Sequence, residues 1–189
     1  ELLLEAHCNP NYADVFGNTA LHMAIMWARR DGNGKAAAVV KLLVAAGCHT
    51  DTVYRYGQTP LYLAAVRGFT LMVSYLLRAA DCNKNTADEN NVTALAAAVK
   101  NGHIEVVQLL LEAGCDIDKV DCNEATAIFR AALMGNTHMV RLLLAAGART
   151  DIANQCGYTP LRAAYRGRHS EVMRLLLEHE EVVQKLRSE

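Results

Sequence analysis

The apolar residues of this chain fall into short runs, and each run follows a small polar phrase. The clearest example is residues 57–65, which read as a turn glycine, a glutamine, a threonine, a proline and then an apolar run. Thr59 can accept a hydrogen bond from a free N–H at a helix start, and Pro60 in the first turn loses no hydrogen bond. The pattern therefore predicts a helix that begins directly after Thr59.

The same phrase occurs five times along the chain, and its threonines stand at positions 19, 59, 93, 126 and 159. A second phrase, Leu-Leu-x-x-Ala-Gly, ends at Gly47, Gly114 and Gly147 in register with the first. Glycine after a helix adopts the left-handed conformation without a Cβ clash, so these glycines are expected to end helices. Each unit is thus predicted to contain a turn, a helix, a loop, a second helix and a glycine stop.

Two phrases that recur in register every 33 or 34 residues, after a first step of 40, resemble the ankyrin repeat family. The resemblance implies an all-α solenoid of helix-loop-helix units with β-hairpin-like loops. We expect one ankyrin-repeat domain over residues 1–189, with about five full repeats. The expected boundaries are a partial repeat at 1–13 and repeats at 14–53, 54–87, 88–120, 121–153 and 154–189. Because residues 1–13 match the end of a repeat, we expect the chain to be a monomeric fragment of a larger protein.

Three departures from the repeat pattern are local. The first repeat has seven extra residues (40 − 33), which fall around residues 29–35 and predict an exposed loop between its helices. Such a loop is either functional or a tolerated surface insertion, and the sequence leaves both open. In the second repeat Ala80 stands where a stop glycine is expected, which predicts a looser joint. In the fourth repeat Glu124 replaces the turn glycine.

Net charge and hydropathy exclude several partners. The formal net charge is −1, which gives no electrostatic reason to expect nucleic acid or an anionic membrane as a ligand. No apolar stretch approaches the roughly 18 residues that a membrane-spanning helix needs. We therefore predict no nucleic-acid and no membrane partner.

The six cysteines invite a disulfide or a zinc site, and their spacing supports neither. Cys8, Cys48 and Cys115 share one position after the helix stop, where cysteine can serve as a small buried apolar residue. No pair has Cys-x-x-Cys spacing, so no metal site is predicted. Reduced structural cysteines indicate a cytoplasmic or nuclear protein.

No motif for catalysis is present. The chain has no Gly-rich phosphate loop, no His-Glu-x-x-His and no Gly-x-Ser-x-Gly. In the ankyrin family a histidine at the position of His22 joins neighbouring helix starts by hydrogen bonds, which implies a structural role. We predict no catalytic residue, no cofactor and no enzymatic activity for these residues.

The resemblance also implies where a partner binds, because ankyrin repeats line a concave groove with their loops and the exposed faces of their first helices. Transferred to this chain, the partner-binding positions are Phe16, Met23, Trp27, Arg55, Tyr56, Gln58, Arg67, Lys100, Asn101, Arg130, Tyr158 and Arg166. Within this set we expect one central cluster of Phe16, Trp27, Arg55, Tyr56 and Arg67, because aromatic residues and arginine dominate interface hot spots.

Over the wider set of groove-lining positions that the resemblance implies, the charged residues are Arg55, Arg67, Lys100, Arg130 and Arg166, against Glu89 as the one acidic residue. This favours an acidic peptide or loop as the partner. Against it stands the simpler interpretation that arginine and lysine only solvate an exposed face, and that Trp27 packs on the inserted loop.

The sequence thus predicts a non-catalytic protein–protein interaction module with a scaffold or adaptor role. One alternative is a regulatory or substrate-docking segment of a larger enzyme, for example a ubiquitin-ligase adaptor. Another is a structural spacer. Fold alone does not decide among these.

Overall fold

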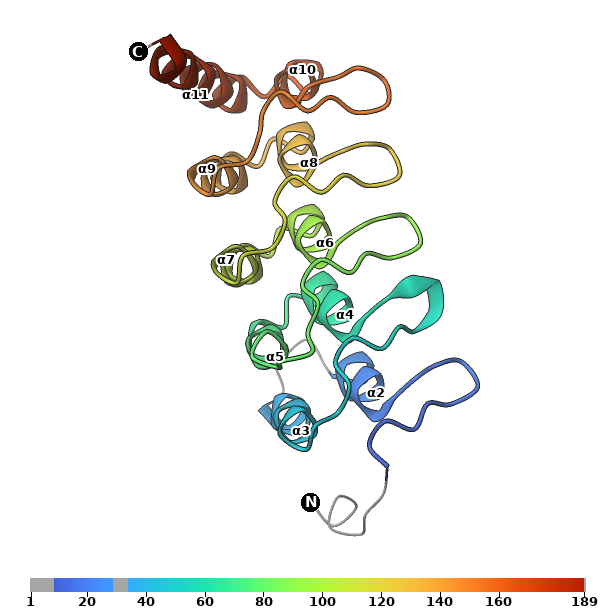
Figure 1. Cartoon of the computed structure of the whole chain (residues 1–189). Coiled ribbons are helices and arrows are strands. Elements are labelled where there is room, and N and C mark those ends of the chain that lie inside the picture. Colours follow the sequence, from blue (N-terminus) through green and yellow to red (C-terminus); the bar gives the residue numbers. More distant parts are fainter. Residues whose placement is uncertain (1–8, 29–33, 189) are drawn as a thin grey trace. The chain divides into compact units, whose positions relative to one another are not determined.

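The computed structural model describes residues 9–28 and 34–188, the last three of them by backbone only. In this part of the chain the secondary structure consists of ten α-helices, one short 3₁₀ turn and no strand (Figure 1). Two isolated antiparallel bridges, between Tyr54 and Gln58 and between Ala87 and Thr93, close loops of hairpin form. The prediction of an all-α fold with hairpin-like loops is confirmed.

The chain divides into two compact units, Glu1–Cys115 and Asp116–Glu189. The single-domain organisation stays a prediction. The first unit contains helices α2 (Ala20–Met26), α3 (Gly34–Ala45), α4 (Pro60–Arg67), α5 (Thr70–Leu76), α6 (Ala94–Lys100) and α7 (Ile104–Glu112), with the 3₁₀ turn η1 at Arg55–Gly57. The second contains α8 (Ala127–Leu133), α9 (Thr137–Ala145), α10 (Pro160–Arg166) and α11 (Ser170–Ser188).

In both units the helices form two layers. In the first unit α2, α4 and α6 pack side by side, and α3, α5 and α7 form the second layer against them (Figure 1). In the second unit α8 packs on α10 and α9 on α11. Fully buried leucines and other apolar residues fill the space between the layers, among them Leu21, Leu61, Leu95 and Leu110 in the first unit and Ile128, Leu143 and Leu176 in the second. A lone helix pair could not bury this surface.

The helices of the first layer begin where the threonine phrase predicts. The hydroxyls of Thr59, Thr93, Thr126 and Thr159 each accept a hydrogen bond from the backbone N–H three residues later, at 3.2–3.4 Å. Thr19 differs, because its N–H and hydroxyl both meet Nδ1 of His22, at 3.3 and 2.9 Å. The caps satisfy N–H groups that would otherwise have no partner in the helix.

The ends of the second-layer helices also follow the sequence. Gly47, Gly114 and Gly147 have φ of +76°, +75° and +86°, the left-handed conformation expected of helix stops. Helix α5, which lacks such a glycine, ends at Leu76 and has 7 residues against 9 in α7 and in α9.

The joint after α5 contains a contact that the sequence pattern did not indicate. The backbone N–H and the hydroxyl of Thr50 donate to the two carboxylate oxygens of Asp81, at 2.9 and 2.7 Å. Burial alone would raise the pKa of Asp81, but the hydrogen bonds from Thr50 outweigh it and the pKa is lowered. The looser joint expected after α5 stays a prediction. In the structure this joint is held by the two hydrogen bonds between Thr50 and Asp81.

The inserted loop was expected at residues 29–35. Residues 29–33 lie outside the described part of the chain. Gly34 and Lys35 belong to α3, so the loop prediction was wrong at that end. Glycine destabilises the interior of a helix, but Gly34 is the first residue of α3, where this cost is small.

In the fourth repeat Glu124 occupies the position of the turn glycine, so its backbone strain can be measured by substitution. Glu124 has φ of +57°, a conformation that strains any residue with a Cβ. We expect Glu124→Gly to raise the free energy of unfolding by about 0.5–1 kcal/mol, because relief of strain exceeds the added flexibility of the unfolded chain. Urea denaturation of the two proteins measures this, and a lower midpoint for the glycine variant would contradict it.

Candidate functional site

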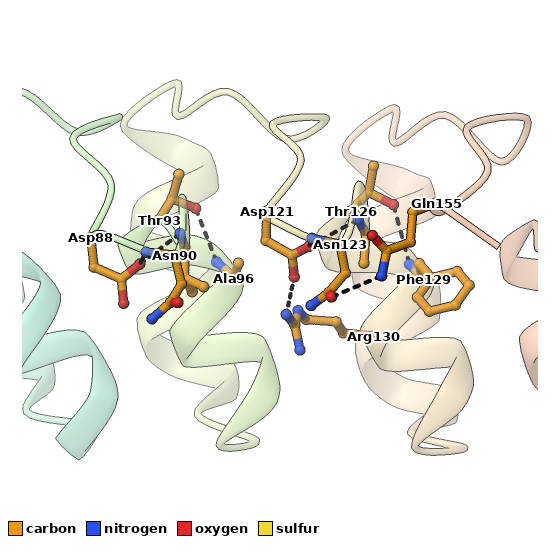
Figure 2. Close-up of polar contacts among 12 residues, drawn as sticks. Asp88, Asn90, Thr93, Ala96, Asp121, Asn123, Thr126, Phe129, Arg130 and Gln155 are labelled. Atoms are coloured by element: carbon orange, nitrogen blue, oxygen red, sulfur yellow. Dashed lines mark hydrogen bonds and ion pairs between the residues drawn. The ribbon is translucent and has the colours of Figure 1, made fainter.

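The loops that precede the first-layer helices are shaped by one recurring side-chain acceptor. In four of them an Asp or Asn Oδ1 accepts hydrogen bonds from the backbone N–H groups two and four residues later, at 2.7–3.1 Å. The acceptors are Asp14, Asp88, Asp121 and Asn154, and Figure 2 shows two of them. Each stands five residues before a capping threonine, so the same period that locates the helices could have located them.

Neighbouring loops are connected through their backbones. In the first unit Glu89 N–H donates to the Tyr56 carbonyl at 2.9 Å, and in the second Gln155 N–H donates to the Asn123 carbonyl at 3.0 Å. The side chains of Gln155 and Asn123 form a further bond at 3.2 Å, drawn in Figure 2. These bonds fix the spacing of successive loop tips, so the side chains at the tips are presented from a rigid frame.

Arg130 was predicted to bind a partner, but its side chain is engaged inside the protein. Its guanidinium pairs with Oδ2 of Asp121, as Figure 2 shows. The side chain of Asp121 is only 1% exposed and that of Arg130 22%. The pair neutralises a buried carboxylate, which is a structural task.

Three predicted residues lie at the loop tips of the first unit, and we call Phe16, Arg55 and Tyr56 the tip cluster. The Arg55 guanidinium lies 4.1 Å from the centroid of the Phe16 ring and 5.9 Å from that of Tyr54. Phe16 and Tyr56 are 54% and 64% exposed. Gln58, also predicted, is half-buried, and its backbone closes the hairpin with Tyr54.

Trp27 and Arg67 lie away from the tip cluster. Phe16 precedes α2 and Trp27 follows its last residue, so the seven residues of the helix, about 10 Å at 1.5 Å per residue, separate them. Arg67 donates from its guanidinium to the carbonyl of Ile25 at 2.8 Å and is half-buried. The structure thus brings Phe16, Arg55 and Tyr56 together and places Trp27 and Arg67 at the other end of α2, and that these five residues bind one partner stays a prediction.

Around the end of α2 the surface is mixed. Trp27 is 76% exposed and Met23, one turn earlier, is 37% exposed. Next to them lies an open groove of about 440 Å³, lined by Met26, Ala28, Val66, Arg67, Phe69, Asn101 and His103. Of the predicted residues, Asn101 thus lines this groove, while Lys100 is exposed on α6. The proposed packing of Trp27 on the inserted loop concerns residues 29–33 and lies outside the described residues.

In the second unit Tyr158 forms the centre of another aromatic and basic group. It is half-buried against Ala125, Phe129 and Ala163. The guanidiniums of Arg162 and Arg166 lie 4.5 and 5.0 Å from its ring centroid. Tyr158 and Arg166 were predicted, whereas Arg162 was missed because it occupies the position of a structural histidine in the repeat phrase.

His22 is fully buried and bonds the Thr19 cap. Burial lowers its pKa. This effect outweighs the backbone hydrogen bonds of Gln58 and Thr52 and the negative charge of Asp14, each of which raises the pKa. The residue is therefore neutral in the fold at neutral pH, which fits the structural role expected from the sequence.

The lowered pKa of His22 predicts a pH dependence of the first unit. Because the folded pKa lies below the unfolded value of 6.5, the unfolded chain binds more protons, and stability falls as the pH drops below about 6.5. The loss amounts to about 1.4 kcal/mol for each unit of separation between the two pKa values. Urea denaturation at pH 7.5 and 5.5 measures the loss. We expect a smaller one in His22→Tyr, the residue that Tyr62 supplies at this position, and equal losses would contradict the assignment.

Of the described cysteines Cys48 is buried, Cys82 and Cys115 are half-buried, and Cys122 and Cys156 are exposed. Cys48 is buried with Sγ 3.9 Å from the Pro10 carbonyl, and Sγ of Cys115 lies 3.9 Å from that of Lys84. Burial raises the pKa of Cys48, and burial together with Asp51 and Asp81 raises that of Cys82 to about 11. Cys8 lies outside the described residues. Among the residues described, no group of three or more His, Cys, Asp or Glu side chains is arranged to hold a metal ion.

Within the described residues, no helix combines the length and the apolar character that a membrane span requires.

Comparison with known proteins supports the repeat assignment. A family model described as ankyrin repeats in three copies matches residues 25–121 and 113–186. A solved structure titled as the ankyrin repeat protein EF0377 superposes with a TM-score of 0.84 at 26% identity, over 93% of this chain and 88% of the other.

Three relatives match parts of the chain. Alpha-latrotoxin-Lg1a of Latrodectus geometricus is 36% identical over 93 residues, 49% of this chain and 6% of the toxin. The putative ankyrin repeat protein YahD of Escherichia coli is 38% identical over 79 residues, 42% of this chain and 38% of YahD. Glycerophosphocholine phosphodiesterase gde1 of Schizosaccharomyces pombe is 33% identical over 104 residues, 54% of this chain and 8% of the enzyme. The chain thus spans well under two thirds of each relative.

Proposed function

Because this chain belongs to the ankyrin repeat family, whose members are generally non-enzymatic modules that bind proteins, we propose that it is a protein–protein interaction module with a scaffold or adaptor role. The observation that carries the proposal is the tip cluster, in which an arginine stacked on an exposed aromatic ring stands beside a second exposed ring. Exposed Trp, Tyr and Arg side chains on a rigid frame are the residues that concentrate binding energy at interfaces.

The partner surface that we propose runs from the tip cluster along the exposed face of α2 to Trp27. Arg55 forms no salt bridge with any carboxylate of the described residues. The nearby carboxylate of Asp14 has its pKa lowered first by the Asn18 side chain and also by the charge of Arg55, but no ion-pair contact joins Asp14 to Arg55. A partner carboxylate can therefore pair with Arg55, which supports an acidic peptide or loop as the partner. Lys100, exposed on α6, adds to the positive charge of the first unit.

The proposal is tested by capture of partners from cell lysate with the whole chain as bait. The test variant carries Phe16→Ala and Arg55→Glu. The control carries Val39→Ala and Arg78→Glu, which truncate an apolar side chain and reverse an arginine charge at exposed positions outside the proposed surface. We expect partners that are captured by the wild type and by the control and lost from the test variant. Partners retained by all three proteins would overturn the proposed surface.

A second candidate is a regulatory or docking segment of a larger enzyme. It is supported by the match to the phosphodiesterase of S. pombe, in which the matched segment is 8% of the length. The sequence that flanks this chain in its gene decides the question, because a catalytic domain would be visible there. A spacer role, the third alternative, predicts that no partner is captured at all.

We further propose a cytoplasmic or nuclear location. The five described cysteines are all free thiols, which supports it, because disulfides are rare in cytosolic and nuclear proteins. Fluorescence microscopy of the tagged full-length protein tests this location.

A further inference from the structure

The helix α10 and the loop that follows it carry positive charge that no salt bridge within the described residues neutralises. Residues 152–170 contain three arginines and no Asp or Glu. None of Arg162, Arg166 and Arg168 forms a salt bridge with a described carboxylate. The other four arginines whose side chains are described in the second unit all do: Arg130, Arg141, Arg149 and Arg174.

Two of these arginines are held side by side on one aromatic ring. Arg162 and Arg166 are one helical turn apart on α10, so they share a face. Their guanidiniums lie 4.5 and 5.0 Å from the centroid of Tyr158. The Tyr158 ring is itself fixed, because its backbone N–H donates to Asn154 at 2.9 Å and the ring packs on Phe129 and Ala163.

The stacking orders the two cations before any ligand binds. A guanidinium that lies against an aromatic face keeps the N–H donors along its edges free for an anion. Two like charges that share one ring also repel, so a ligand with two negative charges gains more than a ligand with one. A side-chain phosphate carries −1.5 to −2 charges at neutral pH and three acceptor oxygens, whereas a carboxylate carries one charge.

We propose that Tyr158, Arg162 and Arg166 form a binding site for a phosphorylated side chain of a partner protein. The inference rests on the proposed function, because it takes the ligand to be part of a protein. Tyr165, which is 69% exposed on the same helix, provides an aromatic surface for the residues that flank the phosphate.

The test is an NMR titration of the whole chain with the synthetic peptide acetyl-Gly-phosphoserine-Gly-amide, up to about 10 mM to reach weak binding. We expect saturable shifts of the Nε–Hε signals of Arg162 and Arg166 and none with the unphosphorylated peptide. Arg162→Gln and Arg166→Gln should each weaken binding by about tenfold or more, since each removes charge-assisted hydrogen bonds. The control Arg168→Gln removes an exposed charge of the same helix end and should change binding by less than about twofold.

Three results would overturn the inference. The first is an absence of shifts at Arg162 and Arg166. The second is an equal loss of binding in Arg168→Gln, which would indicate attraction by net charge only. The third is equal or tighter binding of acetyl-Gly-Asp-Gly-amide or of a short oligonucleotide, which would assign the site to another ligand. Since the peptide is synthetic, a failure to capture a protein partner leaves this titration interpretable.

Discussion

Replacement of Asp121 by alanine is expected to destabilise the second unit by about 3–5 kcal/mol. The carboxylate is buried, accepts from the N–H groups of Asn123 and Ala125 at 2.7 and 3.0 Å, and pairs with Arg130. Alanine leaves the two loop N–H groups and the largely buried guanidinium of Arg130 without their acceptor. Each group left unpaired costs its full desolvation free energy. Urea denaturation, followed by circular dichroism, measures the change.

The chain contains its own control for this prediction. Asp14 occupies the same position of the first repeat and makes the same two backbone contacts, at 2.9 and 2.8 Å. It also accepts from Nδ2 of Asn18 at 2.8 Å, but it is exposed and forms no ion-pair contact with any described residue. Asp14→Ala should therefore cost only about 1 kcal/mol, the value of a solvent-accessible cap. Similar losses of unfolding free energy in the two variants would mean that the buried ion pair of Asp121 with Arg130 adds nothing to stability.

Trp27→Ala is expected to weaken partner binding about 30-fold while leaving the fold intact. An interface tryptophan contributes about 2 kcal/mol or more when a partner covers it, and that energy corresponds to the 30-fold change. The side chain is 76% exposed in the free protein, so its removal should change the free energy of unfolding by less than about 0.5 kcal/mol.

Tyr12 provides the comparison for Trp27. It is an aromatic residue of the same exposed fraction, 76%, placed before α2 and outside the proposed surface. Isothermal titration with a purified partner should give nearly wild-type affinity for Tyr12→Ala. Equal weakening by both substitutions would contradict binding at the α2 surface, because it would show that the partner is attracted by exposed aromatic residues in general.

The period of the sequence was sufficient to predict the fold, because each helix start and stop depends on local chemistry. Thr59 and Pro60 begin α4 and Gly114 follows α7, as the phrases require. The same reasoning could not foresee that Glu124 would accept the left-handed conformation in place of glycine. Backbone strain is tolerated where the surrounding contacts fix the loop, and here Asp121 accepts hydrogen bonds from the N–H groups on both sides of Glu124.

The candidate site was predicted less completely, since a register position fixes the backbone and leaves the direction of long side chains open. Arg55 and Arg130 were both expected to face a partner. Arg55 stacks on Phe16 at the loop tip, whereas Arg130 turns back to Asp121 and neutralises it. Arg67 likewise bonds the end of α2. Only the positions of their carboxylate and carbonyl neighbours in three dimensions separate these roles.

The central claim is that a partner protein binds over the tip cluster and the exposed face of α2. Hydrogen–deuterium exchange of the whole chain, with and without the captured partner, tests it most directly. The account predicts slower exchange on binding in residues 14–18, 23–27 and 54–58, with helices α3 and α5 unchanged. Protection confined to α3 and α5, with the loop tips unaffected, would contradict it.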